Sequence, residues 1–191
     1  MTQQGGSRTT YVLVDGENID ATLGGSILGT RPTPEERPRW ERILEFARGV
    51  WGGDEVKGLF FLNASNGTMP MSFVQALLAI GFQPIPLSGQ AHEKVVDIGI
   101  QRTLDALADR SGDVLLASHD GDFAPQLAAL LGTDRNVGML AFKEFTSGAL
   151  QALTEGGLEI YDLESDVHAF NVRLPRLRII PLDDFDPTFF L

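Results

Sequence analysis

The chain has 191 residues, 43% hydrophobic and 21% charged, a composition typical of an ordinary globular domain with its own core. Its net charge of −11 argues against capture of nucleic acid by a broad basic surface, because such binding depends on Lys and Arg neutralising phosphates. The absence of cysteine excludes disulfides and thiolate metal sites. No apolar run reaches the roughly 18–20 residues of a membrane span, and the first ten residues lack a signal core, so we expect a cytoplasmic protein without a membrane partner.

Strand and helix patterns alternate from the start of the chain. Residues 1–9 are polar and are expected to be disordered. An apolar strand at 11–14 is followed by a glycine-rich stretch, 20–33, which we expect to form a mobile loop above a site. The sequence Thr33-Pro34-Glu35-Glu36 has the pattern of a capping box and predicts a helix that runs to about Val50.

The same rhythm continues to about residue 162. Further strands are predicted at 56–62, 82–87, 113–118, 136–142 and 158–161. Further helices are predicted at 73–78 with a stop at Gly81, at about 93–108, at 123–131 and at 147–154. Pro84 and Pro86 cannot donate ladder hydrogen bonds, so the strand that holds them belongs at a sheet edge. The alternation predicts an α/β fold with a mostly parallel sheet and right-handed crossovers.

The predicted domain spans residues 10–162, and residues 163–191 form a C-terminal extension. The extension has no helical or strand period and ends in Phe189-Phe190-Leu191. An apolar and acidic end of this kind is expected to dock on its own domain or on a second copy. A homodimer through the extension is therefore one prediction.

Two of the predicted strands end in acidic motifs. Asp15-Gly16-Glu17-Asn18 follows the first strand, and Ser118-His119-Asp120-Gly121-Asp122-Phe123 follows the strand at 113–118. The carboxyl ends of parallel strands meet at one edge of an open sheet, where ligands bind. Asp97, in the first turns of the helix at 93–108, would face this edge if the helix begins there. We therefore expect one cluster of four carboxylates: Asp15, Asp97, Asp120 and Asp122.

Such a cluster calls for a cation. Two like charges about 4 Å apart repel by roughly 4 kcal/mol at an effective dielectric constant of 20. Four carboxylates would have raised pKa values or move apart unless a cation lay among them. Oxygen ligands without His or Cys favour Mg²⁺ or Mn²⁺, which can activate water and stabilise the leaving oxygen of a phosphodiester.

Each acid also has an ordinary structural interpretation. Asp122, just before Phe123, could be a helix N-cap. Asp15 could belong to a simple turn, and Asp97 could be a solvated acid on a helix flank. The conjunction of two strand-end motifs with an acid inside a helix favours the metal site.

The neighbouring polar residues are equally open to two interpretations. Asn18 could cap the segment after it, or orient Asp15 and a metal-bound water. Lys94 could be a surface lysine, or an ammonium that positions a phosphate. His92 and His119 are interpreted as loop histidines, and neither is assigned a role.

Three motifs, taken in order, resemble the NYN domain of the PIN-like nuclease superfamily, in its bacterial LabA-like branch. They are Val14 to Asn18, Lys94-Val95-Val96-Asp97-Ile98 and Ser118 to Phe123, and the match covers roughly residues 10–162. The resemblance implies a three-layer, Rossmann-like (PIN-like) fold with a mostly parallel sheet of five to six strands, and Mg²⁺- or Mn²⁺-dependent cleavage of RNA. The family's acidic and polar positions match Asp15, Asp97, Asp120, Asp122, Asn18 and Ser118.

Two features depart from the family pattern. His119 stands where a small residue such as glycine is expected. The acidic chain also has no obvious RNA-binding face. The nearest approach to a basic group is Arg31, Arg37, Arg39, Arg42 and Lys57.

The leading hypothesis is a ribonuclease that hydrolyses RNA phosphodiester bonds with water activated by Mg²⁺ or Mn²⁺. Asp15, Asp120 and Asp122 would hold the metal, and Asp97 would serve a second metal or orient water. The alternative is a non-catalytic module on the same fold that binds RNA or protein. A phosphohydrolase of the haloacid-dehalogenase type is disfavoured, because Asp15-Gly16-Glu17-Asn18-Ile19 lacks the second aspartate and the threonine of that pattern. The chain has no phosphate-binding P-loop and no G-x-S-x-G elbow.

Overall fold

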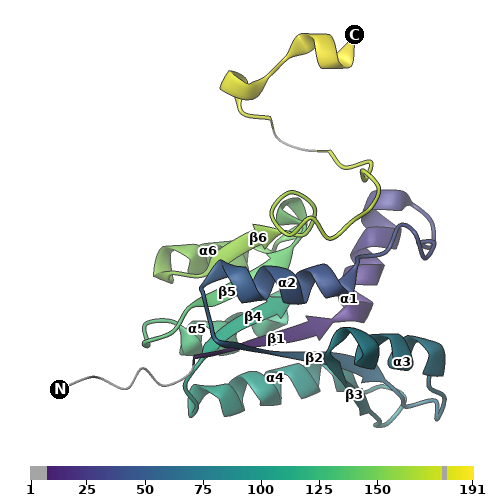
Figure 1. Cartoon of the computed structure of the whole chain (residues 1–191), viewed down its shortest axis with the longest axis vertical. Coiled ribbons are helices and arrows are strands. Elements are labelled where there is room, and N and C mark those ends of the chain that lie inside the picture. Colours follow the sequence, from purple (N-terminus) through teal and green to yellow (C-terminus); the bar gives the residue numbers. More distant parts are fainter. Residues whose placement is uncertain (1–7, 178–179) are drawn as a thin grey trace.

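The protein is built on one open sheet of six parallel strands in the order β3-β2-β1-β4-β5-β6 (Figure 1). The structure is a computed structural model that describes residues 8–177 and 180–191. The strands are β1 Thr9–Asp15, β2 Glu55–Asn63, β3 Phe82–Leu87, β4 Asp113–Ala117, β5 Val137–Ala141 and β6 Glu159–Asp162. The predicted α/β fold with a parallel sheet is confirmed.

Helices cover both faces of this sheet, which gives three layers. On one face lie α1 (Gly16–Thr22), α2 (Trp40–Val50) and α3 (Met71–Ile80), and on the other lie α4 (Val95–Ala108), α5 (Ala124–Leu130) and α6 (Gly148–Ala152). Within β1, Val12 and Val14 belong to the first core and Leu13 to the second, as expected of a strand covered on both faces.

The strand order places β1 next to β4, and the chain reverses its direction of winding between these two strands. Crossovers from β1 lead outward to β2 and β3, and the crossover from β3 returns to β4. In open α/β sheets the ligand crevice lies at such a switch point, at the carboxyl ends of the strands. The two acidic motifs follow the two strands that flank this point.

Two predictions about the segment between β1 and α2 are wrong. The expected mobile loop at 20–33 is largely helical, because α1 continues into a π-helical turn, Leu23–Leu28, that is anchored by buried Ile19 and Leu23. The helix expected from residue 33 begins instead at Trp40. Half of the capping box forms, with Thr33 N donating to Glu36 Oε2 at 2.8 Å, but a proline at 38 disfavours helical backbone at the residue before it.

The other element boundaries agree with the predictions to within a few residues. The proline-bearing strand β3 lies at a sheet edge, as predicted. Gly81 ends α3 with a φ of 100°, a left-handed conformation that favours glycine. Of the residues expected to be disordered, 1–7 lie outside the described part of the chain, whereas Arg8 and Thr9 belong to the fold, with Arg8 Nε donating to Asp113 Oδ2 at 2.8 Å.

Residues 163–177, here called the strap, follow β6 and return across the sheet. Leu163, Val167, Phe170 and Leu174 are buried in the same core as β4, β5 and α2. Arg42 of α2 donates hydrogen bonds to two carbonyl oxygens of the strap, at 2.9 and 3.1 Å. The strap thus helps to cover the face of the sheet on which α1, α2 and α3 lie. None of the helices in the described part of the chain has the length and apolar character needed to cross a membrane.

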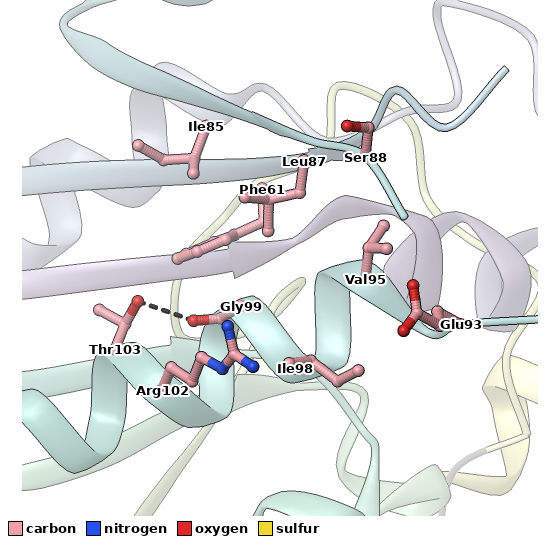
Figure 2. A pocket seen from close by; sticks show the side chains of 10 residues that line it. All are labelled: Phe61, Ile85, Leu87, Ser88, Glu93, Val95, Ile98, Gly99, Arg102 and Thr103. Carbon is pink, nitrogen blue, oxygen red and sulfur yellow. Dashed lines mark hydrogen bonds between the residues drawn. The ribbon is translucent and has the colours of Figure 1, made fainter. Parts of the chain in front are cut away.

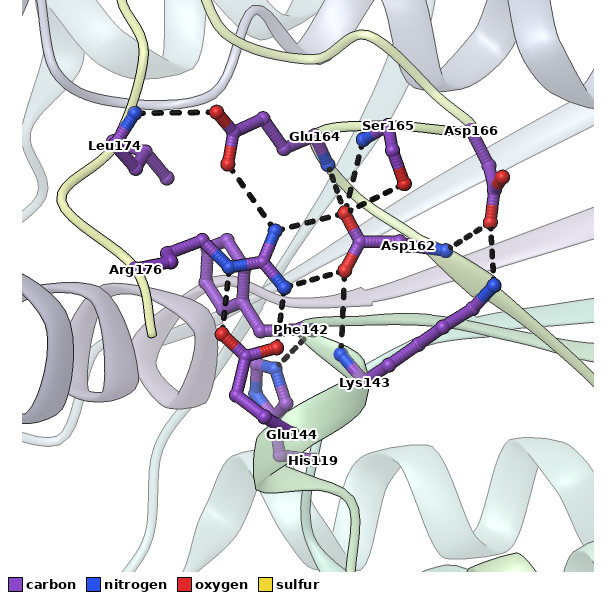
Figure 3. Close-up of polar contacts among 10 residues, drawn as sticks. All are labelled: His119, Phe142, Lys143, Glu144, Asp162, Glu164, Ser165, Asp166, Leu174 and Arg176. Carbon is purple, nitrogen blue, oxygen red and sulfur yellow. Dashed lines mark hydrogen bonds and ion pairs between the residues drawn. The ribbon is translucent and has the colours of Figure 1, made fainter. Parts of the chain in front are cut away.

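A buried arginine fastens the end of the strap (Figure 3). The Arg176 side chain is 3% exposed and pairs with Asp162 at 2.5 Å, with Glu164 at 3.2 Å and with Glu144. Burial alone would raise the pKa of Asp162, but hydrogen bonds from Arg176 and from backbone N–H groups outweigh it and hold that pKa well below its usual range. Three carboxylates therefore depend on one guanidinium.

Replacing this guanidinium tests the attachment of the strap. Arg176→Met is expected to lower the free energy of unfolding in urea at pH 7 by about 3–5 kcal/mol, because it removes the positive charge that these carboxylates share. Lys143→Met is the control, since Lys143 pairs with Asp166 at the surface with its own side chain 52% exposed, and it should cost less than about 1 kcal/mol. Equal stability of the two variants would contradict this account.

Candidate metal centre

The acidic residues meet in a cavity of about 310 Å³ at the carboxyl ends of β1 and β4. Its lining includes Asp15 and Asn18 after β1, Asp120 after β4, and Lys94 and Asp97 at the start of α4. The structure thus brings together segments that are about a hundred residues apart in the chain. Asp122 does not line the cavity but lies beside it.

Three of the four expected carboxylates lie close enough to share one ion. Asp97, Asp120 and Asp122 each offer one oxygen, and these oxygens lie within 4.8 Å of one another. Ligand oxygens on opposite sides of Mg²⁺ are separated by about 4.2 Å, given bonds of roughly 2.1 Å. The donor set is all oxygen, as Mg²⁺ and Mn²⁺ prefer. Adjacent ligand oxygens around such an ion lie only about 3 Å apart, so the three carboxylates would have to move closer together to bind it.

Asp15 lies behind this group and has its own hydrogen bonds. The residue is 2% exposed, Oδ1 accepts from Asn18 N at 3.1 Å, and Oδ2 accepts from Ser118 Oγ at 3.1 Å. Burial raises the pKa of Asp15 to about 6, an effect opposed by these two bonds and reinforced by the charges of Asp97 and Asp120. At neutral pH the ionised carboxylate is held at a cost that a nearby cation would offset.

Lys94 places a positive charge among the acids. Its Nζ lies 3.3 Å from Asp97 Oδ2 and 3.6 Å from Asp122 Oδ2, and its side chain is 68% exposed. The hydrogen bond with Asp97, together with the charges of the three acids, raises the pKa of Lys94. The ammonium is therefore a counter-charge at the mouth of the site rather than an isolated surface lysine.

The structure also decides between the two interpretations of several acids. The N-cap of α5 is Phe123, and it is Asp120, not Asp122, whose carboxylate caps the preceding 3₁₀ turn by accepting from Asp122 N at 2.9 Å. The carboxylate of Asp122 therefore does not cap a helix. Asp97 is only 19% exposed, and Asp15 caps α1 while it faces the cavity.

His119 lies in the loop after β4, as predicted, but it is not a free loop side chain, because it joins this loop to Asn18 in the other acidic motif. His119 is 7% exposed, and both its backbone N, at 2.7 Å, and its Nδ1, at 3.1 Å, contact Asn18 Oδ1. Its Nε2 accepts from Phe142 N at 2.7 Å, so the proton is on Nδ1 and is donated to Asn18. Burial lowers the pKa of His119 to about 4, which keeps the ring neutral at physiological pH. A small residue at this position would leave the oxygen of Asn18 with one donor fewer.

Aromatic stacking extends this link to the strap. The rings of His119 and Phe142 stack with centroids 5.4 Å apart and planes 8° apart, and the guanidinium of Arg176 lies 4.9 Å from the Phe142 centroid (Figure 3). No spacing in the sequence indicates this arrangement, since it joins residues from three separate segments. Arg176 lies outside the predicted domain but contacts a residue that supports the site.

The basic residues singled out in the sequence do not form a free face. Arg37 pairs with Asp20 at 3.0 Å, Arg39 with Glu41 at 3.3 Å, and Lys57 with Glu55 at 3.6 Å. Arg42 is bonded to the strap. Most of this group therefore serves local contacts, and a substrate must be held by other means.

An open parallel sheet whose two central strands deliver carboxylates to one edge is an α/β domain with an acidic site at its switch point. The NYN domain family matches residues 9–157, and the chain belongs to that family of PIN-like nucleases. No curated protein matched the chain. The fold is similar to the crystal structure of VPA0982, a protein of unknown function from Vibrio parahaemolyticus, with a TM-score of 0.64 and 18% identity over 86% of this chain and 98% of that chain. At this identity the likeness concerns the fold alone.

The raised pKa of Asp15 predicts an unusual stability effect. Asp15→Asn should stabilise the metal-free protein by about 1–3 kcal/mol at pH 8, because the variant has no buried charge to maintain. The folded-state pKa of about 6 lies above the ordinary 3.8, so the penalty is absent well below pH 4, grows as pH rises from about 4 to 6, and is complete above 6. Thermal unfolding at pH 8 and pH 4 measures this difference.

The change in melting temperature on adding Mn²⁺ is a complementary measurement. Mn²⁺ should raise the melting temperature of the wild type more than that of Asp15→Asn, since an ion that binds only the folded state stabilises it in proportion to its affinity. A variant less stable than the wild type at pH 8 without metal would contradict the predicted cost of ionising Asp15.

Proposed function

We propose that this protein is a ribonuclease that hydrolyses RNA phosphodiester bonds with the help of Mg²⁺ or Mn²⁺. The observation that carries the proposal is the convergence of Asp97, Asp120 and Asp122 within 4.8 Å of one another beside buried Asp15. Membership of a nuclease family implies a nucleic acid substrate. The choice of RNA, the cytoplasmic location and the LabA-like branch are predictions from the sequence.

In this proposal each residue has a defined task. Asp97, Asp120 and Asp122 would hold the ion, and Asp15 would add negative charge behind them and orient a water through its free lone pairs. Bound Mg²⁺ or Mn²⁺ would supply an activated water and stabilise the charge of the leaving oxygen. Ser118 orients Asp15 through its hydroxyl, and Asn18 joins the two acidic motifs by accepting from His119.

Lys94 lies where its ammonium could bind a phosphate of the substrate. Its ammonium lies at the exposed mouth of the cavity, where a phosphate approaching the ion would replace Asp97 and Asp122 as its partner. The same contact also supports a second candidate function. A lysine that neutralises the acids by itself would allow a non-catalytic RNA- or protein-binding module to keep the fold without a metal.

Substitution of Asp120 tests catalysis directly. Asp120→Asn should lower Mn²⁺-stimulated cleavage of a single-stranded oligoribonucleotide by at least about 100-fold, because it removes a charged ligand from the centre. Asp105→Asn is the matched control, as Asp105 is an exposed acid on α4 that does not line the cavity. Circular dichroism confirms folding of both variants, and unchanged turnover by Asp120→Asn would refute the assignment.

Lys94 separates the two candidate functions. For the nuclease, Lys94→Met should raise KM for RNA about tenfold. The Lys94→Met variant should bind Mn²⁺ at least as tightly as the wild type, because the lysine ammonium no longer competes with the ion for the carboxylates. If the protein is instead a metal-free binding module, isothermal calorimetry of the wild type should detect no Mn²⁺ binding. Crystals soaked in Mn²⁺ should then show no anomalous density among the acids.

The predicted homodimer through the C-terminal extension depends on the part of the extension beyond the strap. Leu182, Phe185 and Leu191 are exposed there, whereas the strap is used in the core of its own domain. Light scattering of the full chain and of a chain ending at Leu177 would measure the contribution of these last residues.

A further inference from the structure

A second cavity, of about 340 Å³, lies between β3 and α4 (Figure 2). Its walls are mostly apolar and include Leu87 of β3, Phe61 of β2, and Val95 and Ile98 of α4. The cavity exists because α4 connects the edge strand β3 to β4 and packs over β2 and β1 on the way, which leaves β3 partly uncovered. Its volume falls within the range of about 300–1,000 Å³ that is typical of small-molecule sites.

The side of this cavity formed by α4 depends on a glycine. A Cβ at Gly99 would lie 2.2 Å from Leu87 Cδ1 and 3.3 Å from Phe61 Cδ1, so a side chain there would displace the cavity wall. The carbonyl of Gly99 accepts from Thr103 Oγ1 at 2.8 Å, so it already has a hydrogen-bond donor. The absence of a side chain at Gly99 thus lets the apolar side chains of Leu87 and Phe61 pack closely against α4 at this side of the cavity.

The cavity adjoins the candidate metal centre. Glu93 and Val95 line both cavities, one on each side of the start of α4. A molecule with a phosphate at the acids would therefore bring the next group of its chain to this cavity.

The rim carries polar groups with spare hydrogen-bonding capacity. Arg102 is exposed, and its guanidinium is turned towards the cavity beside Gly99 (Figure 2). Within the described part of the chain, Arg102 takes part in none of the ion pairs, in contrast to Arg37 and Arg39. Ser88 contributes a hydroxyl at the end of β3.

We propose that this cavity, here called the base pocket, holds the nucleobase of a nucleotide next to the scissile phosphate. The proposal rests on the proposed nuclease function and names a substrate subsite for it. The aliphatic walls would contact the faces of the base, Ser88 would bond its edge, and Arg102 would bind the neighbouring phosphate. A base can enter such a pocket only when it is unpaired, so the substrate class is single-stranded RNA. The base pocket would supply binding that an acidic surface cannot.

The test uses single-stranded oligoribonucleotides in which one abasic ribose is moved along the chain. With the full-length protein and Mn²⁺, kcat/KM should fall by about 5- to 100-fold when the abasic position is adjacent to the cleaved bond, and little when it is several nucleotides away. Equal rates at every position would overturn the base pocket and leave the nuclease proposal intact.

Two protein variants link this dependence to the base pocket. In Ser88→Trp the indole should fill the pocket from its rim. This variant should cleave the intact oligonucleotide as slowly as the wild type cleaves the abasic one, and an abasic position should slow the variant no further. Arg102→Ala should raise KM about tenfold with little change in kcat. Arg110→Ala removes an exposed charge just beyond the other end of α4 and should leave both constants unchanged. Wild-type kinetics in both Ser88→Trp and Arg102→Ala would overturn the proposal.

Binding measurements separate this proposal from the nuclease proposal. Fluorescence anisotropy of the Asp120→Asn protein reports binding without cleavage. Tighter binding of the intact than of the abasic oligonucleotide, lost in the double variant Asp120→Asn/Ser88→Trp, supports the base pocket even if the wild type cuts nothing. Equal binding of the two oligonucleotides, or binding of neither, overturns it.

Discussion

The candidate site depends on a small set of hydrogen bonds that join the two acidic motifs across the switch point of the sheet. Asn18 Oδ1 accepts from the backbone and the ring of His119, and Asp15 accepts from Ser118. Both motifs are acidic and would repel each other, by roughly 4 kcal/mol for a pair of charges about 4 Å apart at an effective dielectric constant of 20. The bonds hold Asp15 close to Asp120 at the cavity that both line, and Asp97 reaches the same cavity from α4. An ion there would need only a closer approach of carboxylates that the fold has already brought together.

Support for these bonds comes from a part of the chain beyond the region that matches the family. The strap buries its apolar residues in the same core as β4 and β5, and Arg176 pairs with three carboxylates while it lies over the ring of Phe142. Phe142 in turn stacks on His119 and donates its N–H to Nε2. Partners on both ring nitrogens fix the tautomer and the orientation of the buried, neutral His119. The ring can therefore hold Asn18 in a defined position.

The electrostatics of the molecule favour a local mode of substrate binding. The chain carries a net charge of −11, and most of the arginines near α2 already form ion pairs or hydrogen bonds within the protein. Long-range attraction of RNA would be weak under these conditions. A divalent ion at the acids, the ammonium of Lys94 and the apolar base pocket with Arg102 would instead concentrate binding at the scissile bond. Such an enzyme would select substrates by local shape and flexibility rather than by total charge.

The sequence by itself determined the alternation of strands and helices, the edge position of β3 and the placement of acids after β1 and β4. These features depend on periodicity, on prolines that lack an N–H and on strand-end motifs, all of which are local. Only the tertiary structure decided that Asp120 caps a turn while Asp122 does not, that residues 20–28 are helical, and that the strap completes the core. It also decided that His119 is buried between Asn18 and Phe142. The burial of the strap and of His119 depends on contacts between segments far apart in the chain, and such contacts leave no period or spacing in the sequence.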